Sequence, residues 1–201
     1  MPIQKIKRGY RKTRYVVYKE TLIDFKEHLW AFIGAFVGMG IISWLQYEAF
    51  PQQDYVFLIG SFGASCVLVY GVIQSPLAQP RNLVGGHVIS AIIGVSIQKL
   101  LPEMIWLSAS LAVALSIVVM QITKTLHPPG GATALIAVTG GPQIKALGYE
   151  YVLNPVLSGA MILLVIALIF NNIPHNRQYP AAPAVIKFRK FKKALRKSIK
   201  A

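Results

Sequence analysis

Five long stretches of almost uncharged, apolar sequence constrain what this chain can fold into. Each is close to the ~20 residues that a helix needs to cross a lipid bilayer. Inside lipid, backbone polar groups must be paired within their own segment, so such stretches become transmembrane helices. The sequence therefore predicts an all-α polytopic membrane protein. The five stretches are residues 30–47, 55–73, 83–101, 104–126 and 151–173.

The composition agrees with this prediction. Of the 201 residues, 54% are hydrophobic and 14% are charged, whereas a soluble domain carries about a quarter charged residues. The length fits one domain. The single cysteine, Cys66, lies in an apolar stretch, which leaves no disulfide framework and no cysteine metal site. We interpret Cys66 as a small packed hydrophobic residue.

The net charge of +14 is concentrated at the two ends of the chain. Residues 1–28 hold eight Lys and Arg against three acids, residues 175–201 hold nine and no acid, and residues 29–174 hold four of each sign. Basic segments that flank an apolar body follow the positive-inside bias and bind anionic lipid headgroups. We therefore expect a transmembrane domain between two basic cytoplasmic segments, and no nucleic acid as a partner.

Both terminal segments carry amphipathic patterns. Residues 15–29 place apolar side chains at helical spacing between charges, which predicts a short interfacial helix. Residues 187–199 do the same, with a disordered basic tail as the alternative. A polar, basic stretch precedes the first apolar one without the small-residue cleavage site of a signal peptide. We expect a multi-pass protein of a bacterial inner (plasma) membrane, with both termini cytoplasmic.

The sixth apolar piece decides the number of crossings. Residues 132–138 are too few to cross alone, have Gly-Gly on both sides, and continue into the less apolar 141–148. Two cytoplasmic termini require an even number of crossings. Six transmembrane helices, with this one short or broken, satisfy that requirement. A re-entrant segment would instead leave five crossings and put the C-terminus outside.

A faint internal repeat relates the two halves of the body. Residues 63–71 (GASCVLVYG) resemble 131–140 (GATALIAVTG), and 80–86 resemble 153–159 around a proline and an asparagine. The first three helices thus match the last three. Because three crossings are an odd number, the two copies have opposite orientations. A 3+3 inverted repeat with broken helices is typical of secondary transporters, whose substrate site lies near the membrane midplane.

The most distinctive local sequence is His-Pro-Pro-Gly-Gly-Ala-Thr at 127–133. Pro128–Pro129 end the fourth helix because they cannot donate backbone hydrogen bonds. Gly130–Gly131 then turn with free amides at the start of the next helix, a position that favours anions. Thr133 adds a hydroxyl, and His127 could carry a proton or donate to the anion. The alternative is a polar turn at the membrane surface with His127 solvated.

The matching region of the first copy is Ser61–Ser65, centred on Gly63. Across a pseudo-twofold axis it would face Gly130–Thr133, so that Ser61 and Ser65 supply paired hydroxyls to the same site. The alternative is that these serines only occupy helix-packing positions, where small residues are common in membrane proteins.

A third group surrounds the start of the third helix. Arg81, beside Asn82, is the only arginine outside the terminal segments. A guanidinium suits bidentate binding of an oxyanion, although an arginine in a cytoplasmic loop also follows from the positive-inside bias. His87 lies within the span, where it is expensive to bury without a partner or a task. Asn154 is its weaker counterpart in the second copy.

The positions of the acids restrict the function. Glu48, Asp54, Glu103 and Glu150 all fall in or beside predicted connections. Cation carriers generally need a carboxylate within the membrane, and two histidines without acids or thiols make a poor metal site. No spacing indicates a hydrolase, so we expect no enzyme, metal or cofactor. Only a Ser–His contact in the structure would revive an intramembrane enzyme.

HPPGGAT at 127–133, SPLAQPRN at 75–82 and Gly-His at 86–87 resemble the motifs of the HPP family of integral membrane proteins. The resemblance covers roughly residues 28–173. Cyanobacterial and chloroplast members of this family are implicated in nitrite transport, so the resemblance implies a small-anion permease. Its signature positions correspond here to Pro76, Gln79, Pro80, Arg81, Asn82, His127, Pro128, Pro129, Gly130 and Gly131.

These observations predict a transporter for a small monovalent anion, nitrite first and nitrate second. A coupled proton could travel on His127 or His87, and a homo-oligomer is expected. A passive anion channel of the same architecture and a non-transporting membrane scaffold remain the alternatives. The expected substrate-binding residues are Ser61, Gly63, Ser65, Arg81, Asn82, His87, His127, Gly130, Gly131 and Thr133.

Overall fold

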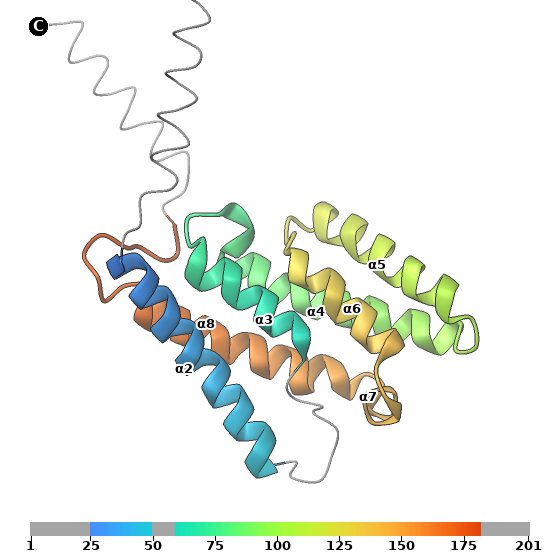
Figure 1. Cartoon of the computed structure of the whole chain (residues 1–201). Helices are drawn as coiled ribbons and strands as arrows, with labels where there is room; N and C mark the ends of the chain where they lie inside the picture. The colour runs from blue at the N-terminus through green and yellow to red at the C-terminus, as the bar shows by residue number, and fades with distance from the viewer. Residues whose placement is uncertain (1–24, 50–58, 182–201) are drawn as a thin grey trace, which may run out of the picture.

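The computed structural model describes residues 25–49 and 59–181, and these residues form helices and the turns between them (Figure 1). The predicted C-terminal amphipathic helix, Asp54 and most of the N-terminal interfacial helix lie outside the described residues. In chain order the elements are α2 (Phe25–Ala49), α3 (Gly60–Cys66) with the π-helical turn η1 (Val67–Gly71), the 3₁₀ turn η2 (Pro76–Ala78), α4 (Pro80–Leu100), α5 (Ile105–Ile122), α6 (Pro128–Thr139), α7 (Pro142–Leu147), the π-helical turn η3 (Val152–Leu157) and α8 (Ser158–Phe170).

Four of the described helical segments are long and apolar enough to cross a membrane: α2, α4, α5 and the segment formed by η3 and α8. The apolar segment α3–η1 and the 12-residue α6 are shorter. Twelve residues of helix span about 18 Å, less than the ~30 Å hydrocarbon core of a bilayer. The prediction of an all-helical membrane protein is confirmed, whereas this arrangement does not by itself confirm six spans in an inverted repeat.

Several helix ends differ from the sequence prediction for local reasons. Helix α6 begins at Pro128 rather than near Ala132, because proline is well suited to the first turn of a helix, where its missing N–H costs nothing. Helix α5 ends at Ile122, and Lys124 then adopts a positive φ of 57°. Within η3, Asn154 departs from helical geometry just before Pro155.

Hydrogen bonds bring four separate segments to one end of the bundle, which we call the terminal face. Tyr179 donates its hydroxyl to the Ala78 carbonyl (2.7 Å), and Asn82 donates to the Leu126 carbonyl (2.7 Å). Asn176 donates to Glu27 Oε1 (2.8 Å). The terminal face therefore comprises residues 25–27, 72–82, 123–127 and 171–181.

The other end of the bundle, the opposite face, carries residues 96–104 and 140–150. Lys99 Nζ lies 5.8 Å from the centre of the Tyr149 ring, and the hydroxyls of Ser96 and Tyr149 are 3.0 Å apart. Because α4 begins at the terminal face and ends here, the two faces are the two ends of the helical bundle.

Helices α4 and α6 approach each other closely because glycines lie between them. A Cβ atom at Gly94 would stand 2.6 Å from the Ala134 carbonyl oxygen, and one at Gly130 would stand 2.8 Å from the Gly86 carbonyl oxygen. Real Cβ atoms do not approach backbone this closely, so both positions require glycine at this spacing. This packing brings the start of α6 against the middle of α4.

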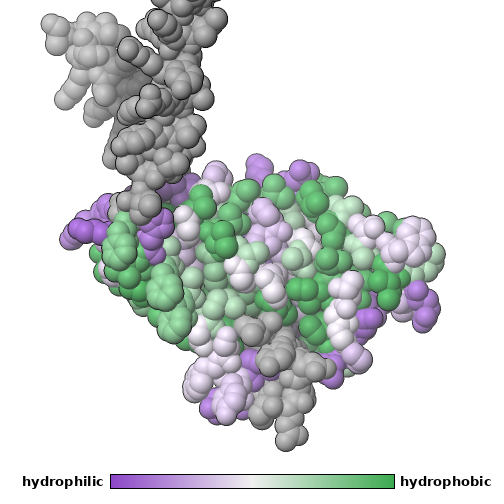
Figure 2. Space-filling model, in the orientation of Figure 1, coloured by the Kyte–Doolittle hydropathy of each residue, from purple (hydrophilic) through white to green (hydrophobic). Residues whose placement is uncertain are grey.

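Large apolar side chains cover the outside of the bundle. Phe32 and Phe36 of α2, Trp106 and Ile122 of α5 and Val165 of α8 are between 48% and 74% exposed. Figure 2 shows an apolar band over the middle of the visible face, with hydrophilic residues gathered towards its margins. Such a surface is incompatible with water and fits a lipid environment.

Candidate functional site

Five polar side chains are buried together where α3, α4 and α6 meet. Ser61 is 1% exposed, and Ser65, His87, His127 and Thr133 are 0% exposed. The two serines belong to α3, His87 lies two turns into α4, His127 is the residue preceding α6, and Thr133 lies within α6. Buried polar groups need hydrogen-bond partners, and these five satisfy one another.

Their polar atoms form one continuous series of contacts. Ser65 Oγ lies 2.9 Å from His127 Nε2 and 2.7 Å from His87 Nε2. The other ring nitrogen of His87, Nδ1, lies 2.7 Å from Thr133 Oγ1. The Thr133 hydroxyl donates to Ser61 Oγ at 2.9 Å. We call this series, His127–Ser65–His87–Thr133–Ser61, the hydroxyl–imidazole chain.

The hydroxyl–imidazole chain runs inward from the terminal face. At its first end, His127 Nδ1 lies 2.8 Å from the carbonyl oxygen of Leu77 in η2, a contact that is only partly buried. At its other end, Ser61 and Thr133 lie deeper in the bundle, where Tyr151 donates its hydroxyl to the Thr133 carbonyl (3.1 Å). Tyr151 directly precedes η3, next to the opposite face.

The two short helices α3 and α6 pair in opposite directions at the hydroxyl–imidazole chain. Ser61 lies beside Thr133, and Ser65 lies beside His127, so the order of contacts along α3 is the reverse of that along α6. Ser65 also reaches the carbonyl of Ser61 at 3.1 Å, as Thr133 reaches that of Pro129 at 3.4 Å. Ser65 and Thr133 are equivalent in the proposed repeat and make the same contact one turn back.

The surroundings of the chain are apolar or aromatic. The ring of Phe62 meets His87 edge-on at 5.5 Å between centroids, and the two imidazoles are 5.1 Å apart. No carboxylate hydrogen-bonds to any of the five side chains. Within the described residues, no group of three His, Cys, Asp or Glu could hold a metal ion.

Arg81 and Asn82 are not part of the hydroxyl–imidazole chain. Arg81 is exposed and donates to the Thr123 carbonyl at 2.5 Å, and Asn82 donates to the Leu126 carbonyl at 2.7 Å. Both side chains thus hold the connection between α5 and α6 against the start of α4. That connection ends at His127, so their contribution to the site is to position it.

The three predicted glycines also lie apart from the polar contacts. Gly63 is exposed, and a Cβ there would meet nothing within 4 Å. The Gly130 amide donates to the His127 carbonyl (2.8 Å), so it is not free for a ligand. Gly131 faces Val113 of α5.

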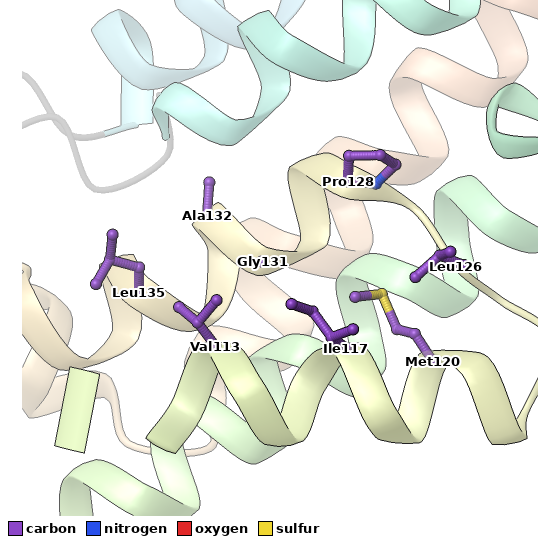
Figure 3. A pocket seen from close by; sticks show the side chains of 8 residues that line it. All are labelled: Val113, Ile117, Met120, Leu126, Pro128, Gly131, Ala132 and Leu135. Carbon is purple, nitrogen blue, oxygen red and sulfur yellow. The ribbon is translucent and has the colours of Figure 1, made fainter. Parts of the chain in front are cut away.

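Gly131 instead lines an apolar cavity of about 510 Å³ between α5 and α6 (Figure 3). Its walls lack the hydrogen-bond donors that an anion requires, and in a bilayer such a gap suits hydrocarbon. The cavity opens on a different face of α6 from Thr133. Its lining residues are Val113, Ile117, Met120, Leu126, Pro128, Gly131, Ala132 and Leu135.

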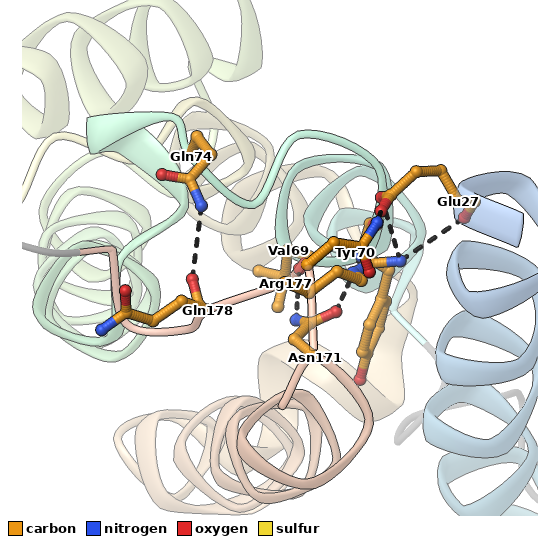
Figure 4. Close-up of polar contacts among 8 residues, drawn as sticks. Glu27, Val69, Tyr70, Gln74, Asn171, Arg177 and Gln178 are labelled. Atoms are coloured by element: carbon orange, nitrogen blue, oxygen red, sulfur yellow. Dashed lines mark hydrogen bonds and ion pairs between the residues drawn. The ribbon is translucent and has the colours of Figure 1, made fainter. Parts of the chain in front are cut away.

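Sequence reasoning missed the structural role of Arg177, which it counted with the basic tail. Arg177 is 6% exposed and donates to the Tyr70 carbonyl (2.7 Å) and Asn171 Oδ1 (2.9 Å), with Glu27 Oε2 at 3.6 Å (Figure 4). Burial lowers the pKa of Arg177 below its ordinary value, and Glu27 opposes that shift. Its separation from the other tail cations, the next of which is Lys187, was the available signal.

Comparison with known proteins identifies relatives over the same body. Residues 20–180 match the family described as HPP, transmembrane region. Two transmembrane proteins of Dictyostelium discoideum are each 44% identical over 160 residues, which is 78% of this chain and 51% or 56% of theirs. The chain thus spans about half the length of these curated relatives. No solved structure matches it.

Proposed function

Because the chain belongs to the HPP transmembrane family, we propose that it carries a small monovalent anion across the membrane, nitrite first and nitrate second. The observation that supports this most directly is the hydroxyl–imidazole chain: buried donors, in the membrane body, with no carboxylate bonded to them. Burying an anion is costly unless donors replace its hydration shell, and hydroxyl and imidazole groups can do so.

The proposed binding residues lie at the deep end of the hydroxyl–imidazole chain. The Thr133 hydroxyl lies within hydrogen-bonding distance of both the Ser61 hydroxyl and His87 Nδ1. Each can turn a hydrogen towards an anion that inserts between α3 and α6. His127 is not part of this set, since its two nitrogens contact Leu77 O and Ser65. Arg81, Asn82 and the three glycines play supporting roles.

A six-span inverted repeat is the architecture that we propose for this carrier. The helices alternate between the terminal and opposite faces, and α3 and α6 pair in opposite directions at the site. Both ends of the described body lie at the terminal face. With basic segments on either side, this face would be cytoplasmic, and the tails would bind anionic lipid headgroups. A homo-oligomer in a bacterial-type plasma membrane completes the proposal.

The Ser65–His87 contact of 2.7 Å favours one other function, an intramembrane hydrolase. The geometry argues against it. The Ser65 oxygen is inaccessible and lies between two imidazoles, and the far nitrogen of His87 contacts the Thr133 hydroxyl rather than a carboxylate. A fluorophosphonate probe labels activated serines. Labelling of the unmodified chain that is lost in Ser65→Ala would establish a hydrolase. We expect no labelling.

Nitrite uptake into proteoliposomes tests the proposed function. Uptake is followed at alkaline pH, where little nitrous acid is present to leak, and protein-free liposomes give the background. Thr133→Val keeps the shape of the side chain but removes its hydroxyl. Losing a hydrogen bond to a charged group costs about 1.5–3 kcal/mol, so we expect uptake to fall about tenfold to a hundredfold.

Ser116→Ala is the matched control, because Ser116 is a buried hydroxyl of α5 that donates only to the Ala112 carbonyl within its own helix. This variant should transport like the unmodified chain. If neither nitrite nor nitrate enters faster than into protein-free liposomes, the transporter proposal is refuted. If Thr133→Val and Ser116→Ala reduce uptake equally, the anion site is not at Thr133.

A further inference from the structure

The partners of the hydroxyl–imidazole chain determine where its hydrogens can lie. The Leu77 carbonyl can only accept, so His127 Nδ1, 2.8 Å away, carries a hydrogen. In a first arrangement Thr133 donates to Ser61, and its oxygen accepts from His87 Nδ1. A neutral His87 then has a bare Nε2, which accepts the hydrogen of Ser65.

This assignment leaves one contact without a hydrogen. In this arrangement Ser65 gives its only hydrogen to His87 rather than to the Ser61 carbonyl 3.1 Å away, so its oxygen accepts from His127 Nε2 at 2.9 Å. That nitrogen must therefore carry a hydrogen in addition to the one on Nδ1. In this first arrangement all the contacts are hydrogen bonds, and His127 is an imidazolium that holds one extra proton.

A second arrangement satisfies the same contacts with one proton fewer. With His127 neutral, Ser65 donates to His127 Nε2 and accepts from His87 Nε2–H, and each remaining hydrogen also points the other way, from Ser61 through Thr133 to His87. The two arrangements use the same four contacts of 2.7–2.9 Å. Passing between them requires no movement of a heavy atom.

We propose that the hydroxyl–imidazole chain is a proton relay that connects the terminal face with the anion site, so that one proton crosses with each anion. This inference rests on the proposed function. The proton enters when His127, with its hydrogen on Nε2 and with Nδ1 bare, forms an Nδ1–H bond beside Leu77 and becomes the imidazolium of the first arrangement. Each group then passes a hydrogen to the next. The Ser61 O–H bond breaks towards the bound nitrite, whose oxygen takes the proton to form nitrous acid, and Thr133 restores the Ser61 hydroxyl.

Electrostatics makes the two charges depend on each other. A buried imidazolium or a buried anion is costly alone, and together they compensate. Other titratable groups on the elements that pack around the relay do not bond to its side chains. These groups are Cys66 in α3, Tyr70 in η1, Tyr151 at the start of η3, and Arg81 and Lys99 at the two ends of α4. Helices α5 and α8 carry no titratable group. On the outer elements, Lys26, Glu27, His28, Tyr47 and Glu48 belong to α2, and Lys145 belongs to α7.

The test separates anion movement from proton movement in one preparation. Proteoliposomes with equal nitrite on both sides exchange labelled for unlabelled nitrite, which needs no net proton transfer. Proteoliposomes with an imposed pH gradient report nitrite accumulation, and a trapped pH dye reports the accompanying protons. Protein-free liposomes correct for nitrous acid leak in both.

His127→Asn breaks the relay at its entry. An asparagine amide can still donate to the Leu77 carbonyl but cannot pass a proton. We expect exchange to persist and gradient-driven accumulation to fall to the protein-free level. Ser65→Ala, which removes the hydroxyl between the two imidazoles, should do the same if His127→Asn does not fold.

Ser90→Ala is the matched control, since Ser90 is a buried hydroxyl of α4 that donates to Met120 Sδ at 3.6 Å, outside the relay. It should retain both activities. Exchange in the unmodified chain without any response to the pH gradient would overturn the relay and leave the carrier standing. Gradient-driven accumulation that survives in a folded His127→Asn or Ser65→Ala protein would do the same. Absence of exchange in the unmodified chain would instead refute the proposed function.

Discussion

At the scale of single residues, side-chain chemistry could be predicted but mutual contact could not. The sequence marked Ser61, Ser65, His87, His127 and Thr133 as candidate anion-binding groups, and His87 as expensive to bury in a membrane. The structure brings these five together through contacts that span 22 to 72 residues along the chain. No local pattern encodes such contacts, because they depend on how three helices pack.

The residues that the sequence misplaced show the same limit. Gly63 and Gly131 adjoin the polar positions in sequence, yet they point to other faces of α3 and α6. Helical residues two positions apart lie about 200° apart around the axis and do not share a face. Arg177 belonged by composition to the basic tail, whereas its burial depends on carbonyl and amide oxygens that lie far away in sequence.

Arg177 provides a residue-scale prediction about stability. Arg177→Ala leaves the Asn171 side chain and the Tyr70 carbonyl without this partner, at a cost of roughly 1–3 kcal/mol. Its melting temperature in detergent should therefore fall. Arg81→Ala is the control, because Arg81 is exposed and its loss should change the melting temperature much less. Equal melting temperatures for Arg177→Ala and the unmodified protein would contradict the structural role.

At the scale of elements, helix type was predictable and helix ends were less so. The apolar stretches gave α2, α4, α5 and α8 from length and composition alone. Pro128 was read as the end of one helix, but it begins α6, since a proline can do either. Close packing of α4 on α6 could not be read from glycine content, because Gly40 and Gly94 look alike in sequence and only Gly94 meets backbone.

These two glycines form a matched pair for an element-scale prediction. Gly94→Ala places a Cβ 2.6 Å from the Ala134 carbonyl oxygen, so α4 and α6 must separate at a cost of about 1–3 kcal/mol. Gly40→Ala meets nothing within 4 Å and should be neutral or stabilising by up to about 1 kcal/mol. Thermal unfolding in detergent measures both. A Gly94→Ala protein as stable as Gly40→Ala would show that the helices are not in this close contact.

At the scale of the whole molecule, the hydropathy pattern predicted a membrane protein and charge predicted its orientation. The number of crossings was harder to predict, since two of the predicted spans are only about 12 residues long. Whether such segments cross depends on the neighbours that enclose them. Here α3 and α6 enclose the buried polar chain between them.

The two faces of the bundle give a prediction about topology. Gln178 belongs to the terminal face and Glu103 to the opposite face. Gln178→Cys and Glu103→Cys should react with a membrane-impermeant maleimide from opposite sides of the membrane. The unmodified chain is the control, because its Cys66 is buried. Labelling of both cysteines from one side would refute an odd number of crossings between them.

The central claim is that this molecule carries an anion rather than forming an open pore, and counterflow tests it most directly. Proteoliposomes are loaded with unlabelled nitrite and diluted into a trace of labelled nitrite. A carrier site that faces each side in turn predicts that label transiently accumulates inside above its outside concentration, and that Thr133→Val abolishes this overshoot. Label that only equilibrates would indicate a passive channel, and label that enters no faster than into protein-free liposomes would contradict transport of nitrite altogether.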